Sequence, residues 1–174
     1  GPWAGQAFRL QLLRTQYRAS LDFTIEGLHE AKAELDDHYA MLSRAPAAPG
    51  GKAATQLADW AIAPLLDDLN TPLALARLRD LRTLENAVTV GGSPAFAMER
   101  AGLSAPPAPG IAAAAFREAA SILGVATGDP AAWRQGGGDD AAAIEAAIAA
   151  RLAARKAKNW AEADRIRDEL TAQG

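Results

Sequence analysis

The apolar residues of this sequence are mostly Ala and Leu, with few Val, Ile or aromatic side chains, and this choice restricts the fold more than any other feature. Ala and Leu lose little conformational freedom in a helix, whereas strands favour β-branched and aromatic residues. Hydrophobic residues make up 49% of the 174, which is enough to build a buried core. The composition therefore predicts an all-α protein.

Apolar side chains recur every three or four positions through most of the chain, as on the buried face of an amphipathic helix. The helices that this spacing predicts span residues 4–19, 24–44, 52 onward, 72–87 and 111–123. In the first of them, Leu10, Leu13 and Tyr17 form the expected buried stripe. Thr24 and Asn70 are placed to cap the helices that follow them, because their side-chain oxygens can accept a free backbone N–H.

Proline and glycine separate these helices. Pro64 should kink or split the third helix, and the segment 45–51 should end the second. Residues 90–110 should form a long surface connection with about one helical turn over 96–100. The three glycines 136–138 are predicted to form a hinge. The resulting organisation is a helical bundle over residues 1–124, a linker over 125–138 and a C-terminal helical hairpin over 139–174.

The hairpin is predicted from two apolar stripes joined by a polar turn at Lys158 and Asn159. Asn159 can cap the second helix, so that the two helices run antiparallel. The apolar residues expected between them are Ile144, Ile148, Leu152, Ala163, Ile166 and Leu170.

Several classes of protein are excluded by what the sequence lacks. No apolar run approaches the ~20 residues of a membrane span, and the first residues show no basic region followed by an apolar stretch, so we expect a cytoplasmic protein without a membrane partner. The chain has no cysteine, which excludes disulfides and thiolate-bound zinc. His29 and His38 lie nine residues apart on roughly opposite faces of one helix, and no phosphate-binding glycine loop follows a strand. We therefore expect no catalytic or metal-binding residue here.

A basic cluster lies in residues 151–174, which hold six basic and four acidic side chains although the net charge of the chain is −3. The cluster contains Arg151, Arg155, Lys156, Lys158, Arg165 and Arg167, with Trp160 among them. On a helix, Arg151, Arg155 and Lys158 share one edge that can contact phosphates, and Trp160 can stack on a nucleobase. The alternative is a solvated basic face with Trp160 packed inside the hairpin.

A second basic pair, Arg14 and Arg18, lies four residues apart on the first predicted helix, away from its apolar stripe. These arginines can meet a phosphate or an acidic partner. An ion pair within the protein, with Asp22 or with a neighbouring helix, explains them equally well.

Three segments carry a resemblance to one known family. Residues 8–23 read FRLQLLRTQYRASLDF, residues 67–72 read DDLNTP, and residues 153–170 read AARKAKNWAEADRIRDEL. Together they resemble the cysteinyl-tRNA synthetases. The first is similar to the helix after that family's second ATP-binding motif, with Gln16 where the family usually has His. The second resembles a signature of the family's helical bundle, and the third resembles its C-terminal anticodon-binding motif. A related mycothiol-pathway ligase typically lacks this third segment, so it is the poorer match.

The resemblance implies a class I synthetase that uses ATP to attach cysteine to its tRNA. In that family the catalytic Rossmann domain, with its ATP-binding motifs and zinc, lies before the matching region, so we expect neither cofactors nor catalysis in this chain alone. It also implies tRNA as the partner, together with a catalytic domain. The RNA-contacting residues expected are Arg14, Arg18, Arg151, Arg155, Lys156, Lys158, Trp160 and Arg167. Since the family continues past Gly174 into a strand-containing element, we expect poor discrimination between tRNAs.

A second hypothesis is a free-standing, truncated synthetase paralogue whose bundle binds another protein through acidic residues of the second helix and the proline-rich connection. An enzyme with a new active site is a third class, for which the sequence offers no set of residues. Genomic context separates the first two, because a reading frame that also encodes the catalytic domain favours the synthetase.

Overall fold

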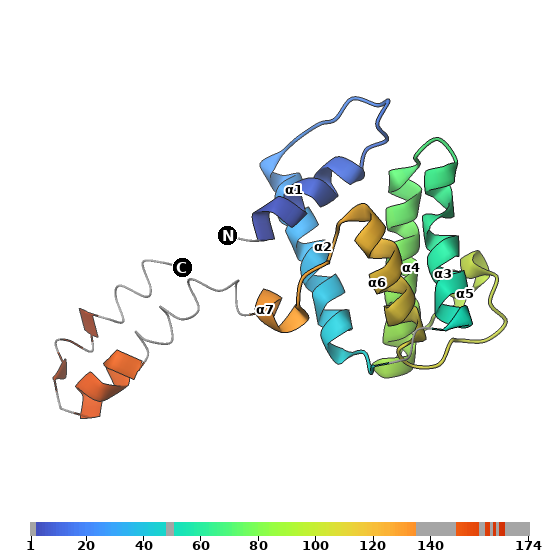
Figure 1. The fold of residues 1–174 in the computed structure, drawn as a ribbon. Coiled ribbons are helices and arrows are strands. Elements are labelled where there is room, and N and C mark those ends of the chain that lie inside the picture. The colour runs from blue at the N-terminus through green and yellow to red at the C-terminus, as the bar shows by residue number, and fades with distance from the viewer. Residues whose placement is uncertain are drawn as a thin grey trace. The chain divides into compact units, whose positions relative to one another are not determined.

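The computed structural model describes residues 3–47, 51–134, 149–156, 159–160, 162 and 164–165. Within these ranges all regular structure is helical, which confirms the all-α prediction (Figure 1). The chain divides into two compact units, Pro2–Ala131 and Ala132–Gly174, the latter together with Gly1. The limits expected from the sequence, 1–124 and 139–174, stay a prediction. No helix among the described residues is both long and apolar enough to cross a membrane.

The larger unit is a bundle in which α6 packs against both α3 and α4, while α1 packs against α2 (Figure 1). Its elements, with the short helix that follows them, are α1 (Trp3–Leu13), α2 (Ile25–Arg44), α3 (Lys52–Ile62), the 3₁₀ turn η1 (Ala63–Leu66), α4 (Thr71–Thr89), α5 (Ala95–Ala101), α6 (Ile111–Leu123) and α7 (Pro130–Arg134). The largest fully buried apolar side chains are Leu10, Leu35, Tyr39, Met41, Leu75, Leu78, Leu81, Leu84, Phe116 and Val125.

The predicted caps of α2 and α4 are confirmed. The Oγ1 atom of Thr24 accepts a hydrogen bond from the backbone N–H of Gly27 at 3.0 Å. Asn70 Oδ1 accepts one from the N–H of Leu73 at 3.1 Å. Pro64 ends α3 as expected, because the chain tightens into η1 directly after Ile62. The helix expected over 111–123 has those bounds, and α5 provides the helical turn in the long connection.

The first helix is shorter than its apolar spacing predicts. It ends at Leu13 rather than near Ala19, and residues 14–24 form turns and irregular backbone. The side chain of Tyr17 was expected in the core but is 57% exposed. Its hydroxyl donates a hydrogen bond to Asp68 Oδ1 at 2.8 Å. Contacts with a turn distant in sequence outweigh the local helical preference here.

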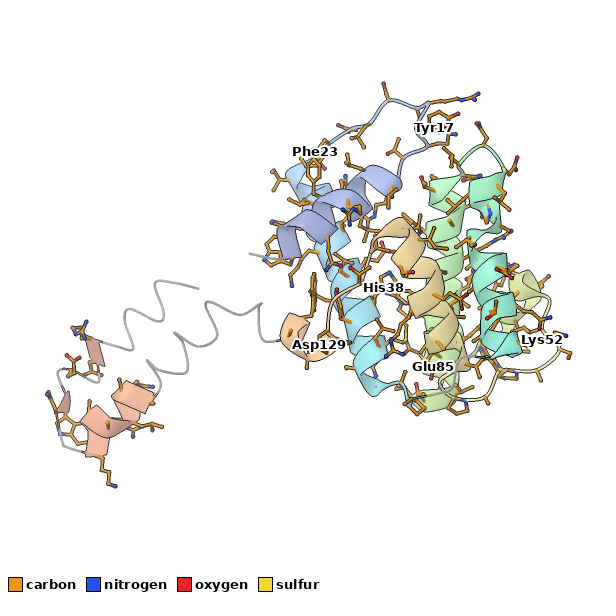
Figure 2. The ribbon with its side chains drawn as sticks, viewed as in Figure 1. Tyr17, Phe23, His38, Lys52, Glu85 and Asp129 are labelled. Atoms are coloured by element: carbon orange, nitrogen blue, oxygen red, sulfur yellow. The ribbon has the colours of Figure 1, made fainter. Side chains whose placement is uncertain are left out.

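A buried carboxylate caps the N-terminus of α6. The residue before this helix, Gly110, has a φ of 88° and no side chain that could cap it. Glu85, completely buried on α4, accepts hydrogen bonds from the backbone N–H of Gly110 at 2.8 Å and of Ala113 at 3.1 Å (Figure 2). A carboxylate at this end also interacts favourably with the helix dipole. Glu85 therefore acts as the N-cap of a helix that follows it by a long connection.

In the smaller unit, the described helical residues 149–156 are followed by a new helical start at Asn159. Asn159 Oδ1 accepts a hydrogen bond from the N–H of Glu162 at 3.3 Å, which confirms the predicted cap. Leu152, expected between the hairpin helices, is 59% exposed. The other apolar residues expected there lie outside the described residues.

Candidate nucleic-acid interface

Arg14, the first expected RNA-contacting residue, lies just past the end of α1 and is held by two carboxylates of α2. Its Nη2 atom donates to Glu34 Oε2 at 2.8 Å, and its Nη1 atom donates to Glu30 Oε2 at 3.2 Å. Only 23% of the Arg14 side chain is exposed. The structure thus shows the alternative of an internal ion pair, with partners on a neighbouring helix.

Glu34 is the centre of this buried charge cluster. Arg79 on α4 donates two hydrogen bonds to it, at 2.6 and 2.9 Å, and His38 Nε2 lies 3.5 Å from Glu34 Oε1. Burial alone would raise the pKa of Glu34, but the contact with His38 and the hydrogen bonds from Arg79 and Arg14 outweigh it and hold that pKa well below its usual range. Glu34 is therefore charged at neutral pH.

His38 lies inside the bundle (Figure 2). Besides its contact with Glu34, its ring packs against the ring of Phe116, with 4.8 Å between the two ring centroids. Burial is the largest cause that lowers the pKa of His38, and the charge of Arg82 acts in the same direction, against the contact with Glu34. Neither ring nitrogen has a partner with hydrogen-bond geometry among the described residues. The ring is thus neutral at pH 7 and packs inside the bundle.

Arg18, the second expected residue, belongs to a loop that is fastened to the turn before α4. Asp68 in this turn forms an ion pair with Arg18 at 3.0 Å and accepts the hydrogen bond from Tyr17, which raises the pKa of that phenol. Gln16 donates to the backbone oxygen of Asp68 at 3.2 Å. Two of the three sequence segments that resemble one family, 8–23 and 67–72, therefore meet in space. Arg18 remains 69% exposed.

Because α1 ends at Leu13, the expected helical edge of Arg14 and Arg18 does not exist. The helix stops before either residue, and each arginine turns to a different carboxylate: Arg14 to Glu34 and Arg18 to Asp68. They do not form one phosphate-contacting surface.

The smaller unit places its described basic residues differently. Arg155 and Lys156 are exposed and form no ion pair with any residue that the structure describes. Trp160 is 59% exposed, so it is open to stacking. Arg151 is partly buried, and its Nε atom has no hydrogen-bond partner in the described part of the chain. The described members of the cluster thus keep donors and a ring face available.

The structure describes only part of this basic cluster. Lys158 and Arg167 lie outside the described residues. Arg165 donates to Glu162 at 2.9 Å, and this hydrogen bond lowers the pKa of the exposed carboxyl. Arg165 is therefore a paired member of the basic group.

Sequence reasoning missed the arginines of α4 and α5. Arg79 binds Glu34, and Arg100 binds the buried carboxylate of Asp80 through two of its nitrogens. One signal was present: Glu30, Glu34 and His38 recur every four residues, which places polar groups on one face of α2. The pattern alone did not say which cations on other helices would meet that face.

The described residues contain no group of three or more His, Cys, Asp or Glu side chains that could hold a metal ion. The zinc that the family resemblance implies finds no fitting set of ligands among these residues.

The chain was compared with known proteins. No model of a protein family matches it. It is 40% identical to a cysteine–tRNA ligase of Pseudomonas paraeruginosa over 172 residues, which cover 97% of this chain and 34% of the ligase. A cysteine–tRNA ligase of Hyphomonas neptunium is also 40% identical, over 99% of this chain and 34% of its own length. That of Chelativorans sp. is 39% identical over 99% of this chain and 30% of its own length.

These relatives confirm the resemblance carried by the three sequence segments. The chain spans about a third of the length of the relatives that it matches. Over nearly its whole length, therefore, this chain is homologous to part of the cysteine–tRNA ligases.

Proposed function

We propose that this chain is the tRNA-binding helical part of a cysteine–tRNA ligase, from the C-terminal region of that enzyme. Its relatives are ligases that join cysteine to tRNA, and the match covers 97–99% of this chain. The ATP-dependent reaction, with its zinc, then belongs to the remainder of the ligase. Such an enzyme acts in the cytoplasm, where tRNA is charged.

The observation that carries the proposal is the exposed group Arg155, Lys156 and Trp160 within a segment that resembles an anticodon-binding motif. Cations without intramolecular partners attract phosphates, and an exposed indole stacks on any base at ~1–3 kcal/mol. Arg151 completes the edge one helical turn before Arg155. In the bundle, Arg18 is the expected contact that stays exposed.

The test is a titration of the purified chain with cysteine tRNA and with a non-cognate tRNA, at two salt concentrations. Binding should weaken as salt rises, because each neutralised phosphate releases counterions. Replacement of Arg151, Arg155 and Lys158 together by Ala should lower the affinity and flatten the salt dependence. Lys52→Ala, an exposed cation at the start of α3, is the control and should change neither. Unchanged affinity in the folded triple variant would reject this RNA-binding face.

Catalysis is tested separately by ATP–pyrophosphate exchange with cysteine. We expect no exchange from this chain alone, since adenylate formation needs residues that position ATP and stabilise the developing charge. Exchange above that of a tag-only control would contradict the proposal that the ATP-dependent reaction belongs to the remainder of the ligase. A large preference for cysteine tRNA in the titration would show that these helices alone read the tRNA.

A further inference from the structure

An open pocket of about 310 Å³ lies on the bundle where α4 faces the end of α3 and the short helix α5. The residues of its lining that matter here are Trp60, Leu73, Arg77, Arg79, Asp80 and Arg100. Three guanidinium groups thus surround one hollow beside an aromatic ring and a single carboxylate.

Two of these arginines are fixed from behind by buried carboxylates. Arg79 donates its Nε and Nη2 hydrogens to Glu34 at 2.6 and 2.9 Å. Arg100 donates Nε to Asp80 Oδ2 at 2.8 Å and Nη2 to the other oxygen. The Nη1 atoms of Arg79 and Arg100 make no hydrogen bond to a described residue, and 40% and 50% of these side chains are exposed. Such arginines lose little side-chain entropy when a ligand binds.

The third arginine is fixed by Trp60. Arg77 Nη1 donates to the backbone oxygen of Trp60, and its guanidinium carbon lies 5.0 Å from the centre of the indole ring. This hydrogen bond and the cation–π contact hold the guanidinium group beside the ring, while Nε and Nη2 of Arg77 make no hydrogen bond to a described residue. All three arginines therefore offer unused N–H donors from held positions.

We propose that this pocket binds a phosphate group. A carboxylate has two oxygens and is satisfied by one arginine fork, whereas a phosphate offers more acceptors and accepts from several guanidinium groups at once. Three guanidinium groups belong to the pocket, and two carboxylates, Asp80 in the lining and Glu34 behind Arg79, offset two of their charges. One positive charge remains, which suits an anion. The phosphate comes either from an RNA backbone or from a small phosphorylated compound. This site is separate from the C-terminal basic group that carries the proposed function.

Leu73 provides a test that leaves every arginine in place. It is 42% exposed, lines the pocket and lies in the first turn of α4, where a glutamate is well tolerated beside the Asn70 cap. Leu73→Glu therefore adds a negative charge to the pocket without unfolding the helix. Leu73→Gln controls for the shape of the new side chain. Ala53→Glu, exposed in the first turn of α3, controls for the added charge.

The probe is pyrophosphate, followed through the NMR signal of the Trp60 indole N–H in the full chain. We expect saturable shifts with similar affinity in the wild type, Leu73→Gln and Ala53→Glu, and an affinity about tenfold lower in Leu73→Glu. No saturable shift in the wild type, or equal affinity in Leu73→Glu and Ala53→Glu, overturns the phosphate site.

Titration with tRNA then identifies the source of the phosphate. If the tRNA affinity of Leu73→Glu falls below that of both controls, the pocket holds a phosphate of the RNA backbone. If pyrophosphate binding is lost but tRNA affinity is unchanged, the phosphate belongs to a small compound. Failure of the wild type to bind any tRNA rejects the proposed function and leaves the pyrophosphate result to decide on the pocket.

Discussion

The bundle and the smaller C-terminal unit use arginine in opposite ways. In the bundle, Arg14, Arg79 and Arg100 each bind a carboxylate that is almost completely buried. In the smaller unit, the exposed Arg155 forms no ion pair with any described residue. Arginine therefore holds helices together in the bundle, with a donor left over on Arg79 and Arg100, whereas no described carboxylate holds Arg155. The difference arises from the carboxylates that tertiary packing brings close.

Glu34 is the strongest test of this contrast. Glu34→Ala leaves Arg14 and Arg79 without their shared partner, so we expect the free energy of unfolding to fall by about 2–4 kcal/mol. The lower part of that range reflects the partial exposure of both arginines. Urea denaturation measures the change. The matched control is Glu30→Gln, whose carboxylate is 73% exposed and should contribute less than ~1 kcal/mol. An equal decrease in the free energy of unfolding of the two variants would show that the buried carboxylate matters no more than the exposed one.

Glu85 tests the second buried carboxylate of the bundle. Glu85→Ala deprives the N–H groups of Gly110 and Ala113 of their acceptor and should lower the free energy of unfolding by about 1–3 kcal/mol. Glu85→Gln keeps one acceptor oxygen and should lose less. Both are compared by thermal and urea unfolding. Identical stability of the wild type and Glu85→Ala would show that the cap is unimportant.

Trp160 tests whether the smaller C-terminal unit uses its exposed side chains for binding rather than for stability. Because its ring is 59% exposed, Trp160→Ala should change the stability by less than ~0.5 kcal/mol, while tRNA binding weakens by ~1–3 kcal/mol if the indole stacks on a base. Melting and affinity are measured on the same variant. A stability loss of ~3–5 kcal/mol would instead indicate that the ring is packed in the hairpin.

The smallest effect is expected from mild acid. The pKa of His38 is lowered in the fold from its ordinary 6.5, so below that pH the unfolded chain binds a proton that the folded chain does not. Stability should therefore decrease as the pH falls from 7.5 to 5.5. Glu34, whose pKa is also lowered, adds a further loss only below its ordinary 4.5. The variant His38→Gln should show a flatter stability profile between pH 7.5 and 5.5.

Helix positions and caps could be predicted because they depend on neighbours in the sequence. The spacing of apolar residues gave the limits of α6, and the side chains of Thr24, Asn70 and Asn159 cap as expected. The predicted end of the first helix was wrong because Tyr17, expected in that helix, instead donates a hydrogen bond to Asp68 in a distant turn. Local spacing carries no information on such a contact.

The candidate site could be predicted only in part, because some of its features depend on neighbours in the sequence and others on tertiary contacts. Arg155 and Trp160 could be predicted as RNA contacts because the local excess of basic residues and their helical spacing are visible in the sequence. The packing of α2, α4 and α5 decides the roles of the other arginines. It pairs Arg14 with Glu34 and places Arg79 and Arg100 in the lining of a pocket. Only the tertiary structure shows that Arg79 and Arg100 hold the bundle together and also keep a donor for a ligand.

The cap formed by Glu85 also bears on how this protein can vary. Glu85 and Asp80 lie on α4 and tie down Gly110 and Arg100, so the intervening segment is held at both ends by the same helix. Between those ties, residues 103–109 are largely exposed. The entropy of closing such a loop grows only slowly with its length. Insertions and deletions should therefore gather at 103–109 among related sequences, and a tag or reporter placed there should leave the bundle intact.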